Sequence, residues 1–188
     1  MEPLTVAVVA VEGALLVALW VGYRRGNTAA VVNTLGAACL TLVPPALAWA
    51  LGTGAAGFRT LTFWVAVAGF LHALGMLGRY ESVGWWDHLT HTLSAALVAA
   101  LLYAALLVVA PGNAVVGTLL GTFALGVLWE IGELIARDVA ERYDIEPVLV
   151  HYGRRDTALD LVFDVVGAGL VLTLDLRSFL PVAEAVVG

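Results

Sequence analysis

Long apolar stretches separated by short polar segments make up most of this chain. Six of them come close to the ~20 residues that a helix needs to cross the hydrocarbon core of a bilayer. A single span cannot leave its backbone N–H and C=O groups unpaired in lipid, so each stretch is predicted to be an α-helix. The predicted spans are 4–22, 28–51, 60–78, 88–110, 114–136 and 157–175.

The second stretch contains Pro44 and Pro45. Proline lacks the N–H that a helix interior requires, and its ring clashes with the preceding turn, so we expect a kink or a break there. No internal repeat and no low-complexity tract divides the chain. The fold class predicted is therefore all-α, a polytopic bundle of about six transmembrane helices in one domain over residues 1–188.

Arginine positions predict which side of the membrane each connection faces. Arg59 and Arg177 fall in the second connection and after the sixth span, whereas the other arginines fall in the first, third and fifth connections. By the positive-inside rule the arginine-rich side is cytoplasmic, so both termini are predicted to lie outside the cell, with the protein in the plasma membrane. The arginines on the predicted inner side are Arg24, Arg25, Arg79, Arg137, Arg142, Arg154 and Arg155.

Composition agrees with a membrane protein. The chain is 61% hydrophobic and 13% charged, whereas soluble domains are nearer one quarter charged. Its formal charge of −6 argues against nucleic acid as a partner, because nucleic-acid binding needs a basic face. Cys39 has no second cysteine to pair with, and the first apolar run lacks a basic segment before it, so we interpret that run as a retained helix.

Three polar stretches interrupt this apolar pattern, each at the end of a predicted span. The first is Trp-Trp-Asp-His-Leu-Thr-His over residues 85–91, the second is Trp-Glu-Ile-Gly-Glu over 129–133, and the third carries three aspartates over 156–164. The predicted topology puts all three on the arginine-rich side. We therefore expect them to meet at one membrane face, although they are far apart in the sequence.

Helical spacing lets each stretch aim its polar groups in one direction. Asp87 and His91 are four residues apart, Glu130 and Glu133 are three apart, and the aspartates of the third stretch recur every four residues. Acids near mid-membrane cost ~2.5–3.5 kcal/mol each on insertion scales. Crowded carboxylates also repel one another, so a bound cation, shared protons or a nearby arginine should offset the repulsion.

A mixed carboxylate and imidazole cluster suits a divalent transition metal such as Zn, Mn or Fe. The predicted metal ligands are Asp87, His88, His91, Glu130, Glu133, Asp160 and Asp164. Among them, the residues predicted to be catalytic are Asp87, His91, Glu130 and Asp164.

Other interpretations of the same residues stay open. Asp87 and Asp156 are also placed to be N-caps of the fourth and sixth helices. His88 could face lipid headgroups, and Glu130 and Glu133 could reach water from a helix end. For each of these residues, the sequence leaves the structural and the functional role side by side.

Glu12 and His72 lie within predicted spans but outside the three polar stretches. An acid inside the membrane is a functional candidate by default, although Glu12 could simply bond to a neighbouring helix. For His72, packing is the simpler interpretation. Gly117 and Gly121 are spaced for close helix contact, either within one subunit or across a homo-oligomer interface.

The order and spacing of the polar blocks resemble those of the YjdF-like family of small bacterial and archaeal membrane proteins. The resemblance rests on Asp87-His88-x-x-His91, on Trp129-Glu130-x-x-Glu133, and on Asp156-Thr157-x-x-Asp160 followed by Gly167-Ala168. It covers about residues 80–175. It implies a polytopic membrane protein and no particular reaction.

Three functions fit this pattern. The first is a metal-dependent membrane enzyme that hydrolyses or modifies a lipid at the inner face, with the bilayer as its partner and a substrate that the sequence does not identify. The second is a proton- or ion-coupled transporter in which the carboxylates carry protons or cations. The third is a non-catalytic membrane scaffold whose polar cluster locks the helices together.

Overall fold

The computed structural model of the chain describes residues 2–54, 56–145, 147–149 and 152–188, and within them it contains helices and no strands. The all-α prediction is confirmed. The main helices are α1 (Pro3–Arg24), α2 (Thr28–Thr41), α3 (Val43–Ala50), α4 (Ala56–Leu74), α6 (Trp86–Val109), α7 (Ala114–Tyr143), α8 (Arg154–Thr173) and α9 (Leu180–Val187). Short turns complete the helical structure: the π-helical η1 (Gly75–Arg79), α5 (Tyr80–Ser82) and the 3-10 turn η2 (Pro111–Asn113).

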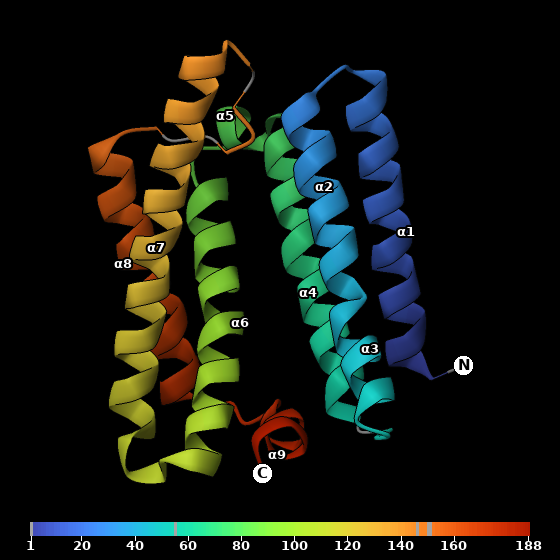
Figure 1. The fold of residues 1–188 in the computed structure, drawn as a ribbon, viewed down its shortest axis with the longest axis vertical. Coiled ribbons are helices and arrows are strands. Elements are labelled where there is room, and N and C mark those ends of the chain that lie inside the picture. Colours follow the sequence, from blue (N-terminus) through green and yellow to red (C-terminus); the bar gives the residue numbers. More distant parts are fainter. Residues whose placement is uncertain (1, 55, 146, 150–151) are drawn as a thin grey trace.

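The helices form two groups that stand side by side (Figure 1). In the first group α1, α2 and α4 pack on one another, and α3 continues the line of α2. In the second group α6, α7 and α8 pack together, with the most extensive contact between α6 and α8. The short helix α9 contacts both α6 and α4 and lies across one end of the molecule.

The helix boundaries follow the sequence closely. The expected break at the proline pair is present, because α2 ends at Thr41 and α3 begins at Val43 with prolines in its first turn. Among the residues that the structure describes, five helical segments are long and apolar enough to cross a membrane, and α8 is not among them. It is nevertheless 20 residues long and is held between α6 and α7. Its three aspartates lower its hydropathy, and two of them are buried against neighbouring helices.

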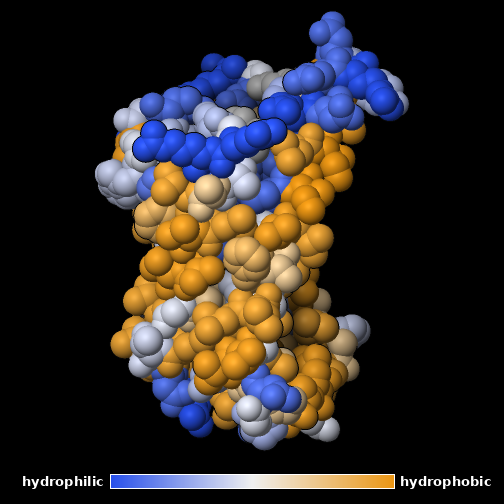
Figure 2. All heavy atoms as spheres, turned by 90° about the vertical axis from the view of Figure 1, so that its left-hand side faces the viewer, coloured by the Kyte–Doolittle hydropathy of each residue, from blue (hydrophilic) through white to orange (hydrophobic). Residues whose placement is uncertain are grey.

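The surface shows how this bundle suits a bilayer. A broad hydrophobic zone covers the middle of the face seen in Figure 2, and hydrophilic residues concentrate at the two ends of this face. The chain termini lie at the same end, opposite the arginine-rich connections after α1 and α7 (Figure 1). An even number of crossings, including α8, explains this arrangement. The three polar stretches therefore share one end of the molecule, as the sequence predicted.

Glycines allow the second group of helices to pack closely. A Cβ on Gly167 of α8 would overlap the backbone carbonyl of Thr92 and lie 2.9 Å from the backbone nitrogen of Ala96, both on α6. A Cβ on Gly117 of α7 would come within 2.8 Å of Leu106. These contacts lie within one subunit. They explain the small-residue pattern without a second copy of the chain.

Candidate metal centre

The side chain of His91 lies at the centre of the polar cluster between α6 and α8. Its Nδ1 is 3.1 Å from Oδ1 of Asp164, within hydrogen-bonding distance. Its Nε2 faces the other way and is 3.9 Å from Oδ1 of Asp87 and 3.9 Å from Oδ1 of Asp160. Helical spacing explains the arrangement, since Asp87 is one turn before His91 on α6 and the two aspartates are one turn apart on α8.

Three donor atoms in this cluster are spaced like the ligands of a metal ion. One atom each from Asp87, His91 and Asp160 lies within 4.8 Å of the other two. Zinc binds histidine nitrogen and carboxylate oxygen at ~2.0–2.2 Å, so its tetrahedral ligands lie about 3.3 Å apart. Side-chain movements on the order of half an ångström would close the observed 3.9 Å separations to that value. The donor set and its spacing thus fit a divalent metal.

Buried polar atoms around these three residues are left without hydrogen-bond partners. Nδ1 of His88 and Oδ1 of Asp160 are both in this state, and they lie 4.0 Å apart. Both carboxylate oxygens of Glu130 are also buried and unpaired. Burying a polar group without a partner is costly, and buried carboxylates are normally paired or bind a metal. A cation in the cluster would satisfy atoms that the protein itself leaves unsatisfied.

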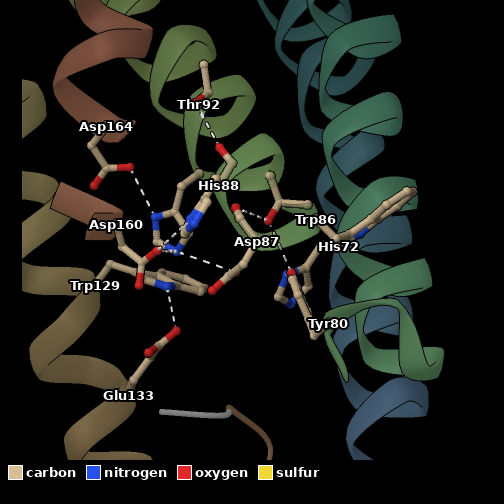
Figure 3. Close-up of polar contacts among 12 residues, drawn as sticks. His72, Tyr80, Trp86, Asp87, His88, Thr92, Trp129, Glu133, Asp160 and Asp164 are labelled. Carbon is tan, nitrogen blue, oxygen red and sulfur yellow. Dashed lines mark hydrogen bonds and ion pairs between the residues drawn. The ribbon is translucent and has the colours of Figure 1, made fainter. Parts of the chain in front are cut away.

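The acids are inside the bundle and not at a wet helix end. Glu130 is only 4% exposed and Glu133 9%, because α7 continues as a helix to Tyr143. Glu133 accepts a hydrogen bond of 2.9 Å from the indole Nε1 of Trp129 (Figure 3). The interpretation of these two glutamates as a water-facing helix end is therefore wrong.

The N-cap interpretation of two aspartates is also wrong. The residue at the N-cap of α6 is Trp85, and Asp87 lies within the first turn. The N-cap of α8 is Gly153, and Asp156 lies in its first turn. Asp87 therefore does not serve as a cap and its carboxylate is directed toward His91. Asp156 is half-buried and lies within electrostatic range of Asp87.

His88 points into the bundle and not toward lipid headgroups. Its ring stacks on Phe163 of α8, with centroids 4.3 Å apart and planes inclined by 11°. Figure 3 shows His88 above Asp160 and on the same side of α6 as Asp87. This stacking fixes the ring plane and leaves the unpaired Nδ1 directed at Asp160.

A missing side chain on α7 makes room for Asp164. A Cβ at Gly126 would overlap Oδ2 of Asp164 and come within 3.2 Å of Leu161. Asp164 is itself 6% exposed, so it has little space to move aside. Gly126 is thus part of the support that holds the Asp164 carboxylate against His91.

A second polar group, which the sequence did not indicate, lies beside the cluster on α4 and α5. Nδ1 of His72 is 2.7 Å from the hydroxyl of Tyr80, and its Nε2 is 3.2 Å from the side-chain oxygen of Asn33. The Tyr80 hydroxyl also donates to the hydroxyl of Thr90 on α6, at 3.5 Å. Gly75 makes this possible, because a Cβ there would overlap the Tyr80 ring. His72 therefore packs within the bundle with a polar partner at each ring nitrogen.

The connection between α7 and α8 joins the two groups of helices at this end. The side chain of Asn33 on α2 donates to the backbone carbonyl of Val148, at 2.5 Å. The hydroxyl of Tyr152 donates to the carboxylate of Glu81, at 3.2 Å, and partial burial together with that negative charge raises the pKa of the tyrosine. These bonds place Val148 and Tyr152 near the polar end of the space between the groups.

The structure brings most of the predicted site residues together. Asp87, His88, His91, Asp160 and Asp164 line the α6–α8 interface. Glu130 and Glu133 approach from α7, close enough for their charges to act on Asp87. Glu12 is separate from them, on α1, which packs against α2 and α4.

Comparison with known sequences identifies the family. A family model described as "Predicted membrane protein (DUF2238)" matches residues 6–179. The chain belongs to this family, which is the YjdF-like family that the polar blocks resemble. No curated protein and no solved structure matches the chain.

Proposed function

We propose that this protein is a metal-dependent membrane enzyme that acts on a lipid at the membrane face where the polar cluster lies. The observation that carries the proposal is the convergence of Asp87, His91 and Asp160, with ligand atoms within 4.8 Å of one another, at one end of an apolar bundle. The unpaired atoms of His88 and Glu130 beside them support it. Two imidazoles with several carboxylates form a donor set suited to Zn, Mn or Fe.

In this proposal the residues around His91 have different roles. Asp87, Asp160 and Nε2 of His91 hold the metal, and Nδ1 of His88 is the nearest candidate for a further ligand. Asp164 orients His91 by accepting the hydrogen bond from its Nδ1, the usual support of a metal-bound histidine. A bound metal supplies a Lewis acid that polarises a substrate oxygen or activates water.

The two glutamates of α7 are suited to move protons in such a reaction. Both are buried next to the cluster, and one oxygen of Glu133 is positioned by the indole of Trp129. The Glu130 carboxylate has no hydrogen-bond partner for either oxygen, so it is available as a further ligand or as a base. A general base must be within hydrogen-bond reach of the proton that it accepts, so this role requires the substrate to bind next to these two carboxylates.

We place this reaction at the cytoplasmic face of the plasma membrane. The end of the bundle that carries the cluster also carries the connections rich in arginine, including Arg24, Arg25, Arg154 and Arg155. The positive-inside rule assigns such connections to the cytoplasm. The termini, at the opposite end, are then outside the cell.

The geometry favours an enzyme over an ion-coupled transporter. A transporter needs polar groups that continue from the cluster toward the opposite side of the membrane. Within the described chain, the lining of the space between the helix groups beyond Ser94 is apolar apart from Thr122. Glu12 lies on α1 and does not line that space. A scaffold role is disfavoured because a purely structural cluster would not leave His88 and Glu130 atoms unpaired.

Metal analysis of the purified protein tests the proposal. The protein should contain about one transition-metal ion per chain, measured by plasma mass spectrometry after removal of loosely bound ions. His91→Ala and Asp160→Asn should each lose it. Asp138→Asn is the matched control, since Asp138 is an exposed acid on the extension of α7 and should retain the metal.

Lipid turnover separates an enzyme from a protein with a structural metal. Purified protein is incubated with vesicles made from total bacterial lipid, with and without a chelator, and the products are followed by mass spectrometry. We expect a product that requires metal and is absent with Asp160→Asn. A wild-type protein without stoichiometric metal would overturn the metal centre, and bound metal without any turnover would overturn the enzyme.

A further inference from the structure

A large cavity lies between the two groups of helices and ends at the candidate metal centre. Its volume is about 960 Å³, near the upper end of the roughly 300–1,000 Å³ found for small-molecule sites. Asp87, His91, Asp164 and Glu133 belong to its lining at one end. Its walls come from α2, α3 and α4 on one side and from α6 and α7 on the other, and α9 lies at its far end (Figure 1).

The lining along α6 changes from polar to apolar with distance from the cluster. Its lining residues recur every three or four positions from 87 to 105, so the cavity follows one face of this helix. Asp87, His91 and Ser94 come first, and Val98, Leu101 and Ala105 follow. A helix rises about 27 Å over that distance, close to the ~30 Å thickness of the hydrocarbon core. The cavity thus has a polar head and a long apolar tail.

The opposite wall has the same gradation. On α4 and the turns after it, Leu61 and Val65 line the apolar part, whereas His72 and Tyr80 line the polar part. The far end is closed by apolar residues of α9, including Val182. Both walls therefore place polar groups at the cluster end and hydrocarbon elsewhere.

The cavity is partly open to the surroundings of the protein. Leu40, Val43 and Leu47 of α2 and α3 line the cavity, yet they are 40–59% exposed. Leu125 of α7 lines it from the other group and is 45% exposed. The described chain leaves these apolar residues uncovered on this side. A hydrocarbon chain could therefore enter sideways from the bilayer.

We propose that this cavity is the binding site for a lipid substrate, with its acyl or isoprenoid chain between α4 and α6 and its oxygen-bearing headgroup at Asp87 and His91, next to Asp160. Water does not fill an apolar space of this kind, and an empty one forfeits the contacts of its lining atoms. Lipid chains are the apolar molecules present at the open side. The position of the lipid headgroup rests on the proposed metal-dependent function. The position of the lipid's hydrocarbon chain rests on the cavity alone.

Photochemical crosslinking in vesicles tests this assignment. Wild-type protein is reconstituted in phosphatidylglycerol vesicles that contain a phospholipid with a diazirine on its acyl chain, and labelled residues are mapped by mass spectrometry. We expect labels on cavity-facing residues such as Val65 and Leu101 in addition to outward-facing ones. Val98→Trp fills the cavity from α6 and should abolish the cavity labels. The matched control, Val116→Trp, alters a residue of α7 that is 61% exposed and should leave them intact.

Two further arms make the outcome decisive. Val65→Trp fills the same space from α4, so the result does not depend on the folding of one variant. Competition with an unlabelled isoprenyl phosphate or an unlabelled phospholipid distinguishes an isoprenoid from an acyl chain. Wild-type labels confined to outward-facing residues such as Val116 and Leu120 would overturn the proposal.

Metal content, measured on the same samples, separates this inference from the proposed function. Cavity labels in a protein without metal would uphold the lipid site and overturn the metal-dependent enzyme. Bound metal in a protein without cavity labels would overturn the lipid site and leave the metal centre standing. A Val98→Trp protein that retains its metal but loses the cavity labels would show that the site for the lipid's hydrocarbon chain is separate from the metal ligands.

Discussion

Nδ1 of His91 lies 3.1 Å from Oδ1 of Asp164, across the interface between α6 and α8. This contact directs the other ring nitrogen of His91 toward Asp87 and Asp160. A histidine held in this way by a carboxylate presents a fixed nitrogen to a metal. The two aspartates of α8, one helical turn apart, therefore have different positions with respect to the same imidazole.

Substitution of the two aspartates should distinguish these positions. Asp164→Asn should weaken metal binding roughly 10–100-fold, as removal of outer-shell partners usually does. Asp160→Asn removes a direct ligand and should abolish stoichiometric binding. Titration of the metal-free protein with Zn²⁺ or Mn²⁺ in a calorimeter measures both. Equal losses of metal affinity in the two variants would contradict the assignment of Asp164 as a residue that orients His91.

A methyl group on α7 should disturb the same contact indirectly. The Cβ of Gly126→Ala would overlap Oδ2 of Asp164, so the carboxylate must move away from His91. We expect metal affinity to fall by roughly the factor that Asp164→Asn produces, about 10–100-fold. Gly132→Ala on the same helix is the matched control, because a Cβ there meets nothing within 4 Å. An unchanged affinity in Gly126→Ala would show that Asp164 does not need its observed position.

The sequence predicted the spans and the shared end of the polar stretches for a physical reason. Lipid requires helices, and apolar runs of the right length have few alternatives. Successive connections lie on opposite sides of the membrane, and this places residues 85–91, 129–133 and 156–164 at one end of the bundle. The spacing of four along α8 could not, however, distinguish Asp160 from Asp164, because that depends on how α8 is rotated against α6.

The polar group around His72 depends on tertiary structure that no local pattern indicates. The contact between Tyr80 and His72 spans a kink in the chain between α4 and α5, where Gly78 has a φ of 114°. Asn33 reaches the same imidazole from another helix. A lone histidine in an apolar run is usually packed, and these hydrogen bonds agree with a structural role for His72 whose partners the sequence could not name. The cavity could not be predicted from the sequence either. Apolar residues that face a cavity have the same sequence pattern as apolar residues that face lipid.

Close contact between α6 and α8 should make the bundle sensitive to one methyl group. Gly167→Ala places a Cβ against the backbone of Thr92 and Ala96, which cannot move without shifting α6. Overpacking of this kind costs about 1–3 kcal/mol. The melting temperature in detergent should fall accordingly, measured by the loss of helical circular dichroism.

The neighbouring glycine provides the comparison for that experiment. A Cβ on Gly169 meets nothing within 4 Å, so Gly169→Ala should be neutral or stabilise the helix by about 0.5–1 kcal/mol. If both variants melt at the same temperature, α6 and α8 pack less tightly than the Cβ distances at Gly167 indicate. If Gly167→Ala also loses metal, the packing of the two helices supports the ligand geometry as well as the fold.

Stability at the opposite end of the molecule should depend on acid through Asp175. This residue follows α8, and its Oδ1 accepts hydrogen bonds from the Tyr103 hydroxyl at 2.7 Å and from Nε of Arg177 at 2.9 Å. The bond from Arg177, followed by that from Tyr103, lowers the pKa of Asp175 below its ordinary 3.8. A lowered pKa in the folded state means that the ionised carboxylate stabilises the fold above the ordinary pKa. That contribution is lost as the pH falls through the lowered value.

The difference in melting temperature between wild type and Asp175→Asn should therefore be present at neutral pH and should shrink as the pH falls from the ordinary pKa of 3.8 through the lowered one. Because Asp175 is exposed, the difference should be small and should decrease with added salt. Asp144→Asn is the matched control, since Asp144 is also exposed and has a similar left-handed backbone, with φ of 52° against 48°. A pH dependence of equal size in both variants would show that loss of a surface charge, and not the bonds to Tyr103 and Arg177, is responsible.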